Sequence, residues 1–422
     1  MKVLVVGGGG REHALCWKLR KSPLLTRLFC APGNAGIAGI ADCVDIAQND
    51  LDGLVRFAKE QSIDLTVVGP EEPLCQGIVD RFQAAGLRIF GPTKAAAEIE
   101  GSKAFARELC RRHRIPSPGS WTFEDMPQAF AFLDNRTEGP IVVKASGLAA
   151  GKGVTLSKSH EEAKVAVRAA MEQRRFGDAG RVVVLEETLV GEELSVMVLT
   201  DGKTIVPLEA ARDHKAVFDG DKGPNTGGMG AYSPVPTLGH RTQRQIENQV
   251  LFPAIHAMNR EERPFRGFLY AGLMLTSGGP RVLEFNCRLG DPETQPLLMR
   301  LRSDLLPLLL HAAEGTLDQL EAPQFDSRAA VCVVAASGGY PGDYKKGYVI
   351  RGLDGVAASD DVQVFHAGTE RRGNEVLTSG GRVLSVTALG ANLSEARTKA
   401  YAALEGIEFT GMQYRKDIGG RG

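Results

Sequence analysis

Polar side chains between residues 282 and 296 could hold a metal ion beside a phosphate group. Residues Val282 to Phe285 are typical of a short strand, which runs into a turn marked by glycine and proline. Glu284 and Asn286 are two residues apart, so on a strand both side chains point to the same face. A carboxylate and an amide oxygen side by side suit a hard cation such as Mg2+, which usually keeps phosphate oxygens as further ligands.

Arg288 follows this pair, and its guanidinium could hold a carboxylate or a phosphate beside that metal. The alternative is an edge strand with a solvated polar face. Cys287 fits a small buried filler on the face opposite Asn286. The metal hypothesis is preferred because other stretches of the chain indicate the same partner, a nucleotide triphosphate.

A lysine on a second predicted strand precedes a glycine-rich loop. Lys144 could contact phosphate oxygens, and the backbone N–H groups of Gly147, Gly151 and Gly153 could cover a polyphosphate. The loop is not a P-loop, because Lys152 is followed by glycine instead of serine or threonine. A loose hairpin loop is the alternative, which the two lysines make less attractive.

Two further segments carry polar residues that suit a nucleotide and its substrate. Glu186 to Leu189 and Gly191 to Glu193 could form a hinge with acceptors for a nucleotide amine and a ribose, although a solvated acidic turn would look similar. Asp213 to Lys215 precede the loop Gly223 to Gly230. A loop so rich in glycine and so poor in apolar residues has no core to join, which favours a functional role.

The N-terminal glycines predict an anion site. A buried strand over residues 2–6 runs through Gly7 to Gly10 into a helix, and backbone N–H groups at a helix N-terminus bind anions. A dinucleotide fingerprint does not fit, because its third glycine would fall on Glu12 or His13. The second strand also ends without an acidic residue for a ribose hydroxyl. NAD is therefore disfavoured, and a phosphate on another substrate remains plausible.

Strands and helices alternate over the first ninety or so residues, which predicts a doubly wound parallel sheet. Helices are expected near 51–61 and 74–85, and strands at Leu65 to Val68 and Arg88 to Phe90. The loops that follow such strands should gather at the carboxyl edge of the sheet.

The remaining chain predicts a mixed α/β region and a small α+β terminal region. Long helices are expected over 93–114, 160–174, 241–259 and Leu297 to Glu314. After Pro323 the expected elements are strands at Ala329 to Ala335, Gly347 to Ile350, Gln363 to Gly368 and Arg382 to Leu389, and a helix near 394–404.

Composition limits the class of protein. A chain of 422 residues is too long for one ordinary core, so two to four domains are expected. With 50 basic and 51 acidic side chains, net charge gives no reason to expect nucleic acid or a membrane surface as partner. The start of the chain has no signal-peptide layout, and seven scattered cysteines fit reduced thiols. A cytoplasmic protein is expected.

The combined motifs resemble the glycinamide ribonucleotide synthetase family, also called phosphoribosylamine–glycine ligases, of the ATP-grasp superfamily. The resemblance runs from end to end and is most specific at Asn225-Thr-Gly and at Glu284 to Glu293. The other motifs that carry it are Gly7 to His13, Ala31 to Gly36, Val68 to Glu71, Phe90 to Pro92, Gly147 to Gly153, Gly223 to Tyr232 and Arg415 to Gly419.

The resemblance implies four parts with ATP between lid and central domain. These are an N-terminal doubly wound domain over 1–102, a lid over 121–189, a central domain over 103–120 and 190–326, and an α+β C-terminal domain over 327–422. The implied reaction joins glycine to 5-phosphoribosylamine with ATP, through a glycyl phosphate, in de novo purine biosynthesis. The implied cofactor is Mg2+, with Mn2+ as an alternative, and the protein would be a monomer or weak homodimer.

The resemblance also implies roles for individual residues. The metal ligands would be Glu284 and Asn286, and catalysis would involve Asp213, Lys215 and Arg288. ATP would be bound by Lys103, Lys144, Gly151, Lys152, Gly153, Glu186, Glu187, Leu189 and Glu193. The substrates would contact Gly9, Gly10, Arg11, Glu12, Asn34, Gly36, Glu71, Asp213, Asn225, Gly228 and Asp291.

Three departures from the family pattern affect the expected site. The chain has Ser146 where Asp is usual and Ala216 where Arg is usual. Many ATP-grasp enzymes have a further acidic metal ligand one strand back, where Gly272 or Leu273 stands here, so two protein ligands are expected. The base for attack by the amine stays open among Asp213, His214 and Asp291.

Two rival functions remain at this level. A biotin-type carboxylase would share the lid and the metal strand, and trapping the phosphorylated acid would distinguish it. A non-enzymatic module that binds a nucleotide or NAD is the second rival. Turnover of ATP that depends on both co-substrates would exclude that module.

Overall fold

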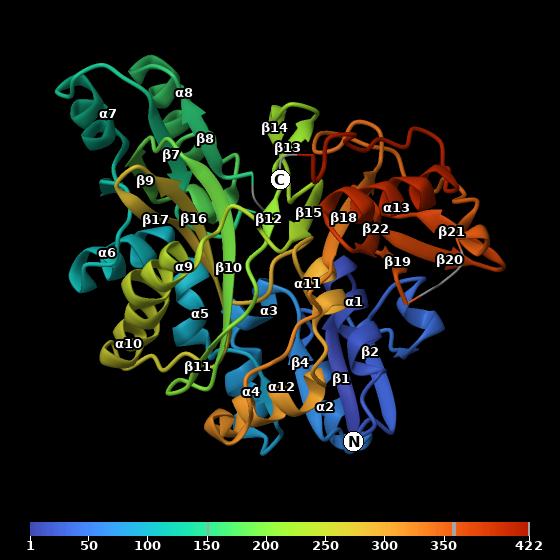
Figure 1. Ribbon diagram of the computed structural model, residues 1–422. Helices are drawn as coiled ribbons and strands as arrows, with labels where there is room; N and C mark the ends of the chain where they lie inside the picture. The colour runs from blue at the N-terminus through green and yellow to red at the C-terminus, as the bar shows by residue number, and fades with distance from the viewer. Residues whose placement is uncertain (150–151, 357–359, 421–422) are drawn as a thin grey trace.

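The computed structural model describes residues 1–149, 152–356 and 360–420. Its strands form four larger sheets and two isolated hairpins (Figure 1). Within those ranges, no helix has both the length and the apolar character that a membrane span requires.

The first sheet is parallel throughout, with the order β3-β2-β1-β4-β5, which confirms the predicted α/β start of the chain. Four residues of β1 are fully buried, as expected for a central strand covered on both faces. The elements are β1 (Lys2–Gly7), α1 (Gly10–Leu19), β2 (Arg27–Pro32), η1 (Ile37–Gly39), β3 (Asp42–Cys43), α2 (Leu51–Glu60), β4 (Leu65–Val68), α3 (Glu71–Gln76), α4 (Ile78–Ala84) and β5 (Ile89–Phe90).

Two predicted helices are each divided in the structure. The helix expected near 74–85 is broken by Gly77, whose φ of 92° separates α3 from α4. The stretch 93–114 consists of α5 (Lys94–Gly101) and α6 (Lys103–His113). Ser102 is extended, and its side chain accepts from the backbone N of Phe105 at 3.2 Å, so it caps a new helix. Lys103 therefore lies in the first turn of α6.

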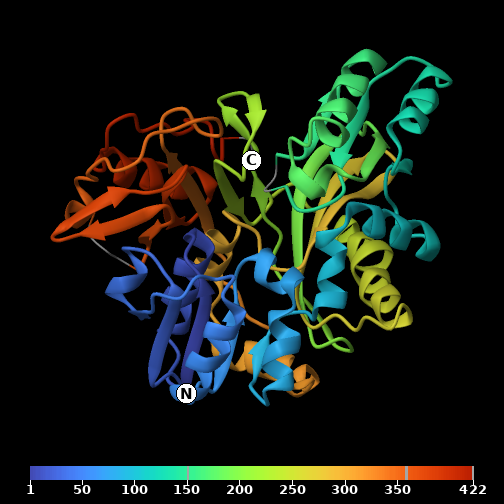
Figure 2. The ribbon, with the colours of Figure 1, turned by 180° about the vertical axis from the view of Figure 1, so that it is seen from behind.

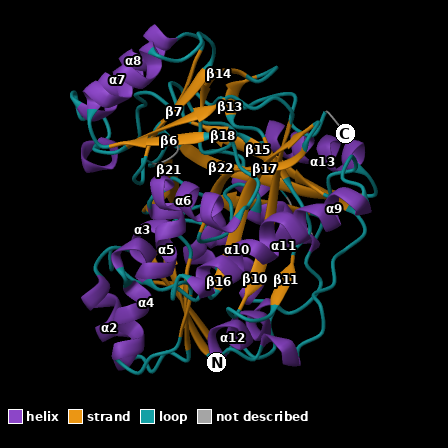
Figure 3. Ribbon diagram, turned by 90° about the vertical axis from the view of Figure 1, so that its left-hand side faces the viewer, coloured by secondary structure: helices purple, strands orange, loops and turns teal. Residues whose placement is uncertain are grey.

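A separate antiparallel sheet has the order β6-β9-β7-β8 and is called the lid sheet here, because it lies in the region predicted to be the lid. Figure 3 shows α7 and α8 together at one end of the molecule, beside these strands. Buried apolar residues of both helices and two of the strands, β7 and β9, form a core of their own, from Ala129 to Leu185. The elements are β6 (Ser120–Phe123), α7 (Met126–Asp134), β7 (Ile141–Ala145), β8 (Val154–Ser157), α8 (His160–Met171), η2 (Gly177–Gly180) and β9 (Val183–Glu187).

The central sheet is antiparallel, with the order β11-β10-β16-β17. Its register shifts between Gly272, which pairs with Glu284, and Leu273, which pairs with Val282. Leu283 is the extra residue of this β-bulge, so Val282 is buried while Glu284 and Asn286 share the accessible face. The strands are β10 (Glu192–Thr200), β11 (Ile205–Pro207), β16 (Gly267–Thr276) and β17 (Gly279–Asn286).

The helices around this sheet are also more divided than predicted. The helix expected over 241–259 contains a π-helical segment, and the helix expected from Leu297 to Glu314 is interrupted before Asp304, which caps a new helix by accepting from Leu306 N at 3.0 Å. The elements are α9 (His240–Ile246), η3 (Glu247–Leu251), α10 (Phe252–Arg260), α11 (Thr294–Arg300), α12 (Leu305–Glu314) and η4 (Leu317–Gln319).

The last large sheet, of order β12-β15-β18-β22-β19, joins two short strands from the middle of the chain to three C-terminal strands. The predicted strand from Gly347 to Ile350 is wrong: only an isolated bridge joins Val349 to Leu377. The elements are β12 (Arg212–Asp213), β15 (Gly230–Ser233), β18 (Ala329–Ala336), η5 (Leu353–Gly355), β19 (Val362–His366), β22 (Arg382–Gly390) and α13 (Leu393–Glu405), with the hairpins β13 (Ala216–Phe218) to β14 (Lys222–Asn225) and β20 (Thr369–Arg372) to β21 (Glu375–Thr378).

Candidate active site

A buried ion network occupies the contact between the lid sheet and α6. Lys144 on β7 places its Nζ 2.8 Å from Oε2 of Glu186 on the neighbouring strand β9. Arg107 of α6 holds the same carboxylate with two hydrogen bonds of 2.6 and 3.0 Å. Burial lowers the pKa of Lys144 to about 8, although Glu186 acts in the opposite direction. The carboxylate of Glu186 therefore orients two cations inside the site.

The bulge on β17 is part of the same network. Its Leu283 carbonyl accepts from Lys144 Nζ at 2.9 Å and from Arg107 Nη2 at 2.5 Å. The extra residue of a bulge leaves the regular ladder, so its carbonyl is available to such donors. Sequence analysis missed Arg107. The available signal was an arginine beside Ala106 and Cys110 on the buried face of α6.

Lys103 lies where α6 meets the loop after β7. Its Nζ donates to the carbonyl of Gly147 at 3.3 Å. Burial lowers its pKa, against the effect of Glu284, Glu100 and Glu186. Ser146, one of the departures from the family pattern, is buried and its Oγ accepts from Ala104 N at 3.1 Å. This serine therefore binds the N-terminus of α6, the turn that carries Lys103.

The glycine-rich loop connects β7 to β8. Gly153 is packed tightly, because a Cβ there would lie 2.7 Å from Cβ of Ala149, and its carbonyl accepts from Ala145 N at 2.8 Å. Lys152 is exposed, and its backbone N donates to Ala149 O at 2.9 Å. Gly151, also predicted to contact ATP, lies outside the described residues.

The remaining predicted ATP residues lie at the turn between β9 and β10. Glu187 is exposed and accepts from Gly119 N at 3.2 Å, and Leu189 is half-buried. Glu193 on β10 extends further, with its Oε2 3.0 Å from Nζ of Lys215. Of these three residues, Glu193 is the one that an ion pair joins to the predicted catalytic lysine.

Lys215 lies between carboxylates from two strands. Its Nζ is 3.0 Å from Glu193 and 3.8 Å from Oε1 of Glu284. Burial alone would lower the pKa of Lys215, but Asp213, Glu193 and Glu284 raise it well above its usual value. Burial raises the pKa of Asp213 to about 7, with Lys215 opposing. Lys215 therefore stays charged, while Asp213 can exchange a proton near neutral pH.

Three lysines act on Glu284. Burial would raise its pKa, but Lys215, Lys144 and Lys103 lower it, so the side chain is ionised at neutral pH. The lysines come from β7, from α6 and from the residue before β13, which are far apart in the sequence. Cations that act together on one carboxylate could also balance the charge of a polyphosphate.

The donor set at the end of β17 fits a hard cation. Asn286 donates from Nδ2 to the carbonyl of Phe285 at 2.7 Å, a bond that does not use its side-chain oxygen, and it lies on the same strand face as Glu284. Gly272, directly opposite Glu284, has no side chain to add. In the described part of the chain, no group of three or more His, Cys, Asp or Glu side chains could hold a metal by itself. Two protein ligands completed by phosphate and water agree with these donors.

Arg288 is held by two carboxylates of the N-terminal region. Its Nε lies 3.0 Å from Glu71, the first residue of α3, and its Nη2 lies 2.8 Å from Glu100 of α5. Burial opposes the effect, but Arg288 and Arg11 lower the pKa of Glu71 to about 2. Glu100 was not predicted; it also accepts from the backbone N of Cys287 at 2.7 Å. These contacts fix the segment that follows β17 against α3 and α5.

The helix N-terminus predicted to bind an anion faces carboxylates of the protein itself. Glu12 accepts from Gly9 N at 2.6 Å and pairs with Arg11 Nε at 2.6 Å. Asp291 reaches the same turn, where a Cβ on Gly10 would lie 3.7 Å from its Oδ1. Burial would raise the pKa of Asp291, but Arg382 and Arg11 lower it. A substrate here meets a turn already lined by carboxylates.

Asn34 and Gly36 connect this turn to the C-terminal sheet. The Asn34 amide donates to the carbonyls of Gly8 and His366, both at 2.9 Å. Its oxygen accepts from the backbone N of Gly36 at 2.9 Å. A Cβ on Gly36 would lie 2.5 Å from the rings of His13 and His366. Both residues therefore shape the loop, and the Asn34 amide is already hydrogen-bonded within it.

The glycine-rich loop after β14 touches the turn after β17. Gly228 has a φ of 112°, and a Cβ there would lie 2.4 Å from Cδ of Pro292. Arg382 on β22 donates from Nη1 to the carbonyls of Gly227 at 2.7 Å and Asp291 at 2.6 Å. Sequence analysis did not identify Arg382, which joins the two loops. Asn225 is exposed at the end of β14.

A buried hydrogen-bond chain lies beside Asp213. Oγ of Ser195 donates to Glu293 at 3.0 Å and lies 2.9 Å from the hydroxyl of Tyr270. Glu293 also helps to raise the pKa of Asp213, after burial. His214, a second of the three open candidates, has a pKa that burial lowers to about 4. None of these three chain residues was predicted individually, because their pairing depends on β10 and β16 lying side by side.

Comparison with known proteins covers the whole chain. The N, ATP-grasp (A) and C domain models of phosphoribosylglycinamide synthetase match residues 1–100, 101–294 and 330–421. A phosphoribosylamine–glycine ligase from Allochromatium vinosum is 53% identical over 100% of this chain and 98% of its own length. One from Rhodopirellula baltica is 50% identical over 99% of this chain and 96% of its own.

Solved structures agree with this relationship. The crystal structure of phosphoribosylamine–glycine ligase from Thermotoga maritima has a TM-score of 0.86 and 32% identity, and covers 99% of this chain and 100% of that one. A biotin carboxylase domain from Hydrogenobacter thermophilus has a TM-score of 0.74 at 17% identity, over 98% of this chain and 91% of that one. The second likeness shows the fold alone.

Proposed function

The chain belongs to the phosphoribosylglycinamide synthetase family, and we propose that it joins glycine to 5-phosphoribosylamine in an ATP-dependent reaction of de novo purine biosynthesis. The products are glycinamide ribonucleotide, ADP and phosphate. The observation that supports the assigned site best is the position of Glu284 among cations: Lys215 pairs with it at 3.8 Å, and the charges of Lys144 and Lys103 also lower its pKa. Family membership also disfavours the biotin-type carboxylase and the non-enzymatic module as alternatives.

The first step activates glycine. A carboxylate has no good leaving group, so the terminal phosphoryl group of ATP is transferred to it and a glycyl phosphate forms. Lys103 and Lys144 hold the phosphates, and Arg288 and Lys215 balance the charge on the transferring group. The adenosine lies along Glu186 to Glu193, under the glycine-rich loop of Gly147 to Gly153. That loop excludes water, which would otherwise hydrolyse the acyl phosphate.

Glu284 and Asn286 would hold the divalent cation that ATP brings. The cation supplies positive charge to the phosphate oxygens. We propose Mg2+, with Mn2+ as an alternative. The protein would work in the cytoplasm as a monomer or weak homodimer, and its four parts would keep the limits at residues 102, 120, 189 and 326 inferred from the sequence.

The second step is attack by the amine of phosphoribosylamine on the acyl phosphate. As the C–N bond forms, the bond from the carbonyl carbon to the phosphate oxygen breaks and phosphate leaves. The amine loses a proton in this step, and we assign Asp213 as its acceptor. Its pKa near 7 suits a base at neutral pH. Asp291 is paired with Arg382, whose Nη2 lies 3.3 Å from its carboxylate, and is the weaker candidate. The ribose phosphate would lie among the loops of Gly9 to Glu12, Asn34, Gly36, Asn225, Gly228 and Asp291.

An ADP-release assay tests the function. Phosphoribosylamine is generated in place and the amino acid is varied, with ATP and Mg2+ fixed. ADP should form only when both phosphoribosylamine and glycine are present. Equal release without the amine, or with another amino acid in place of glycine, would refute the proposal.

A further inference from the structure

The hairpin of β13 and β14 stands outside every larger sheet of the described structure. A two-stranded hairpin is only marginally stable by itself in water. Yet Lys215 directly precedes β13, and Asn225 ends β14. Figures 1 and 2 show this hairpin between the lid sheet and the C-terminal strands. Contacts outside the hairpin must therefore fix its position.

Those contacts come from residues 414–418, which are called the C-terminal segment here. Arg415, with 1% of its surface exposed, donates from Nη1 to the carbonyl of Ala216 at 3.0 Å and pairs with Asp221 at 2.9 Å. Asp417 binds the same guanidinium with two hydrogen bonds of 2.7 Å. Asp417 also accepts from Gly220 N at 2.9 Å. One buried arginine thus bridges the base and the tip of the hairpin.

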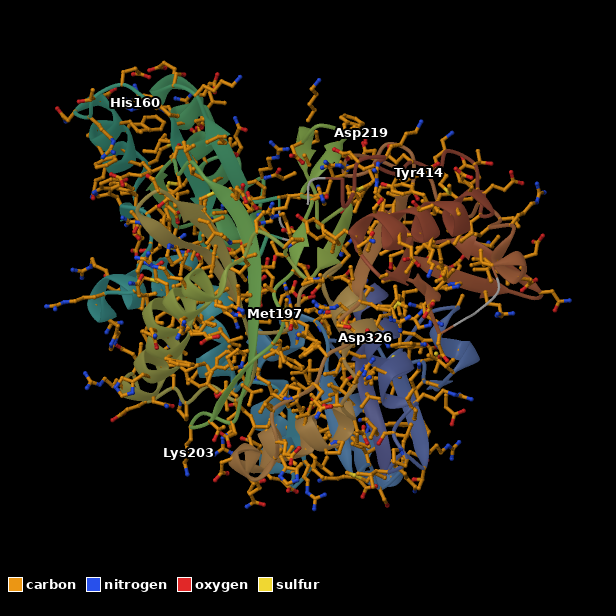
Figure 4. The ribbon with its side chains drawn as sticks, viewed as in Figure 1. His160, Met197, Lys203, Asp219, Asp326 and Tyr414 are labelled. Carbon is orange, nitrogen blue, oxygen red and sulfur yellow. The ribbon has the colours of Figure 1, made fainter. Side chains whose placement is uncertain are left out.

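A further hydrogen bond joins the neighbouring residues. The backbone N of Lys416 donates to Oδ1 of Asp219 at 2.7 Å. Figure 4 labels Asp219 at the hairpin and Tyr414 on the C-terminal segment. The segment contacts the hairpin at its first strand and at its turn, on residues that are about two hundred positions earlier in the chain.

The C-terminal segment is itself firmly attached. The hydroxyl of Tyr401 on α13 donates to the carbonyl of Arg415 at 2.7 Å and accepts from Ile418 N at 3.2 Å. Ile418 is fully buried, and a Cβ on Gly230 of β15 would lie 2.7 Å from it. The guanidinium is therefore presented from a rigid base made by α13 and the last large sheet.

The position of the hairpin determines the position of Lys215 in the proposed site. Thr226, just after β14, donates to the carbonyl of Lys215 from both its backbone N and its Oγ1, at 2.8 Å each. From that fixed backbone, the Lys215 side chain spans to Glu193 on β10 and Glu284 on β17. A shift of the hairpin would therefore move the ammonium relative to both carboxylates.

We propose that Arg415 is a positioning residue, which acts through Ala216 and the hairpin to keep Lys215 between Glu193 and Glu284. The inference rests on the role of Lys215 in the proposed function. It assigns a structural role to the Arg415 to Gly419 motif, which has no role in the proposed reaction steps. Arginine is required because its planar fork binds Asp417 with two hydrogen bonds and still reaches the carbonyl, which a lysine cannot do.

The test compares Arg415→Gln and Arg415→Lys with Lys416→Gln, an exposed cation on the same segment. We expect kcat to fall about ten- to hundredfold for Arg415→Gln, because small displacements of a catalytic group have effects of that size. The KM for ATP should change little, since Lys103 and Lys144 lie on other elements. Arg415→Lys should be only partly active, and Lys416→Gln should match the parent. Circular dichroism and thermal unfolding give the folded fraction.

A double-mutant cycle with Lys215→Gln distinguishes positioning from general stability. In the Lys215→Gln background, Arg415→Gln should lower kcat by less than about twofold, because the group it positions is gone. Equal losses in both backgrounds, or activity like Lys416→Gln, would overturn the proposal. If Arg415→Gln does not fold, Asp221→Asn, which removes its half-exposed partner, is used in the same cycle.

The failures are distinguishable. Near-normal activity of Lys215→Gln would refute the catalytic role assigned to that lysine, and the positioning role with it. Loss of activity in Lys215→Gln together with full kcat in folded Arg415→Gln would refute the positioning role alone.

Discussion

Lys144 and Glu186 lie on adjacent strands of the lid, with the lysine Nζ 2.8 Å from the carboxylate. The lysine assigned to ATP therefore already has a counter-ion, which burial and Arg107 hold in one place. Phosphate oxygens of ATP would share this ammonium with Glu186. The protonation state of Lys144 can therefore be measured through the pH dependence of activity.

Activity should fall as pH rises through about 8, where Lys144 loses its proton. Below that pH the ammonium is charged and can bind phosphate. Glu186→Gln should move this alkaline limb of kcat/KM for ATP to lower pH, because it removes the carboxylate that supports the charged form. Lys144→Arg, which stays charged, should lack the limb in whatever activity it retains. If the alkaline limb lies at the same pH in the parent, Glu186→Gln and Lys144→Arg, it reports the titration of a group other than Lys144.

Asp213 should govern the acidic side of the profile. Burial raises its pKa to about 7, and only the ionised form can accept the proton of the amine, so kcat should rise with pH through this value. Asp213→Asn should remove the limb and lower kcat by about 10²- to 10⁴-fold, as for loss of a general base. His214→Gln serves as the comparison and should keep a limb near pH 7. If the limb disappears in His214→Gln instead, Asp213 is not the base.

Glu284→Gln should leave folding largely intact and abolish most turnover. The side chain is about one-third exposed, so the change removes the charge of the proposed metal ligand and little packing. Steady-state rates over a range of Mg2+, together with direct binding of Mn2+ to the folded variant, measure the effect. Glu375→Gln, at an exposed carboxylate on β21, provides the control. Normal activity of Glu284→Gln at ordinary Mg2+ would remove it from the metal role.

Gly228→Ala should destabilise the protein and reduce activity. The new Cβ would lie 2.4 Å from Pro292 Cδ, and φ is 112°, which side chains rarely adopt. Strain of this kind costs about 1–3 kcal/mol. Gly239→Ala is the matched control, because nothing lies within 4 Å of its Cβ and its φ is −77°. Urea unfolding of both variants gives the difference, and equal midpoints would contradict the close packing of these loops.

Oxygen labelling tests the acyl phosphate directly. In phosphoryl transfer, a carboxylate oxygen of glycine bridges to phosphorus and leaves with it when the amine attacks. Glycine labelled with heavy oxygen should therefore pass one labelled atom into inorganic phosphate, with ADP as the other product, as read by mass spectrometry. Labelled AMP, or unlabelled phosphate beside the formed amide, would refute the mechanism. Phosphate released without amide reports hydrolysis by water, and the amide yield is therefore measured in the same sample.

Local pattern was sufficient for much of the fold. The apolar runs of β1 and β4 and the alternating helices predict the parallel sheet, and the spacing of Glu284 and Asn286 predicts that they share a face. Helix limits were less predictable. The cap at Ser102 and the φ of Gly77 end helices whose apolar pattern continues across the break.

The sequence alone determined the chemical types in the site: the lysines, the metal-binding pair, the glycine loops and the family they resemble. Tertiary structure decided which groups meet. Arg107, Glu100 and Arg382 were not predicted, and Arg415 was recognised only as part of a motif, because the contacts that give them a role join distant parts of the chain. Arg107 and Glu186 are 79 positions apart, and Arg415 and Ala216 are 199 apart. An ion pair depends on distance in space, and only the packed sheets bring these charges within hydrogen-bonding reach.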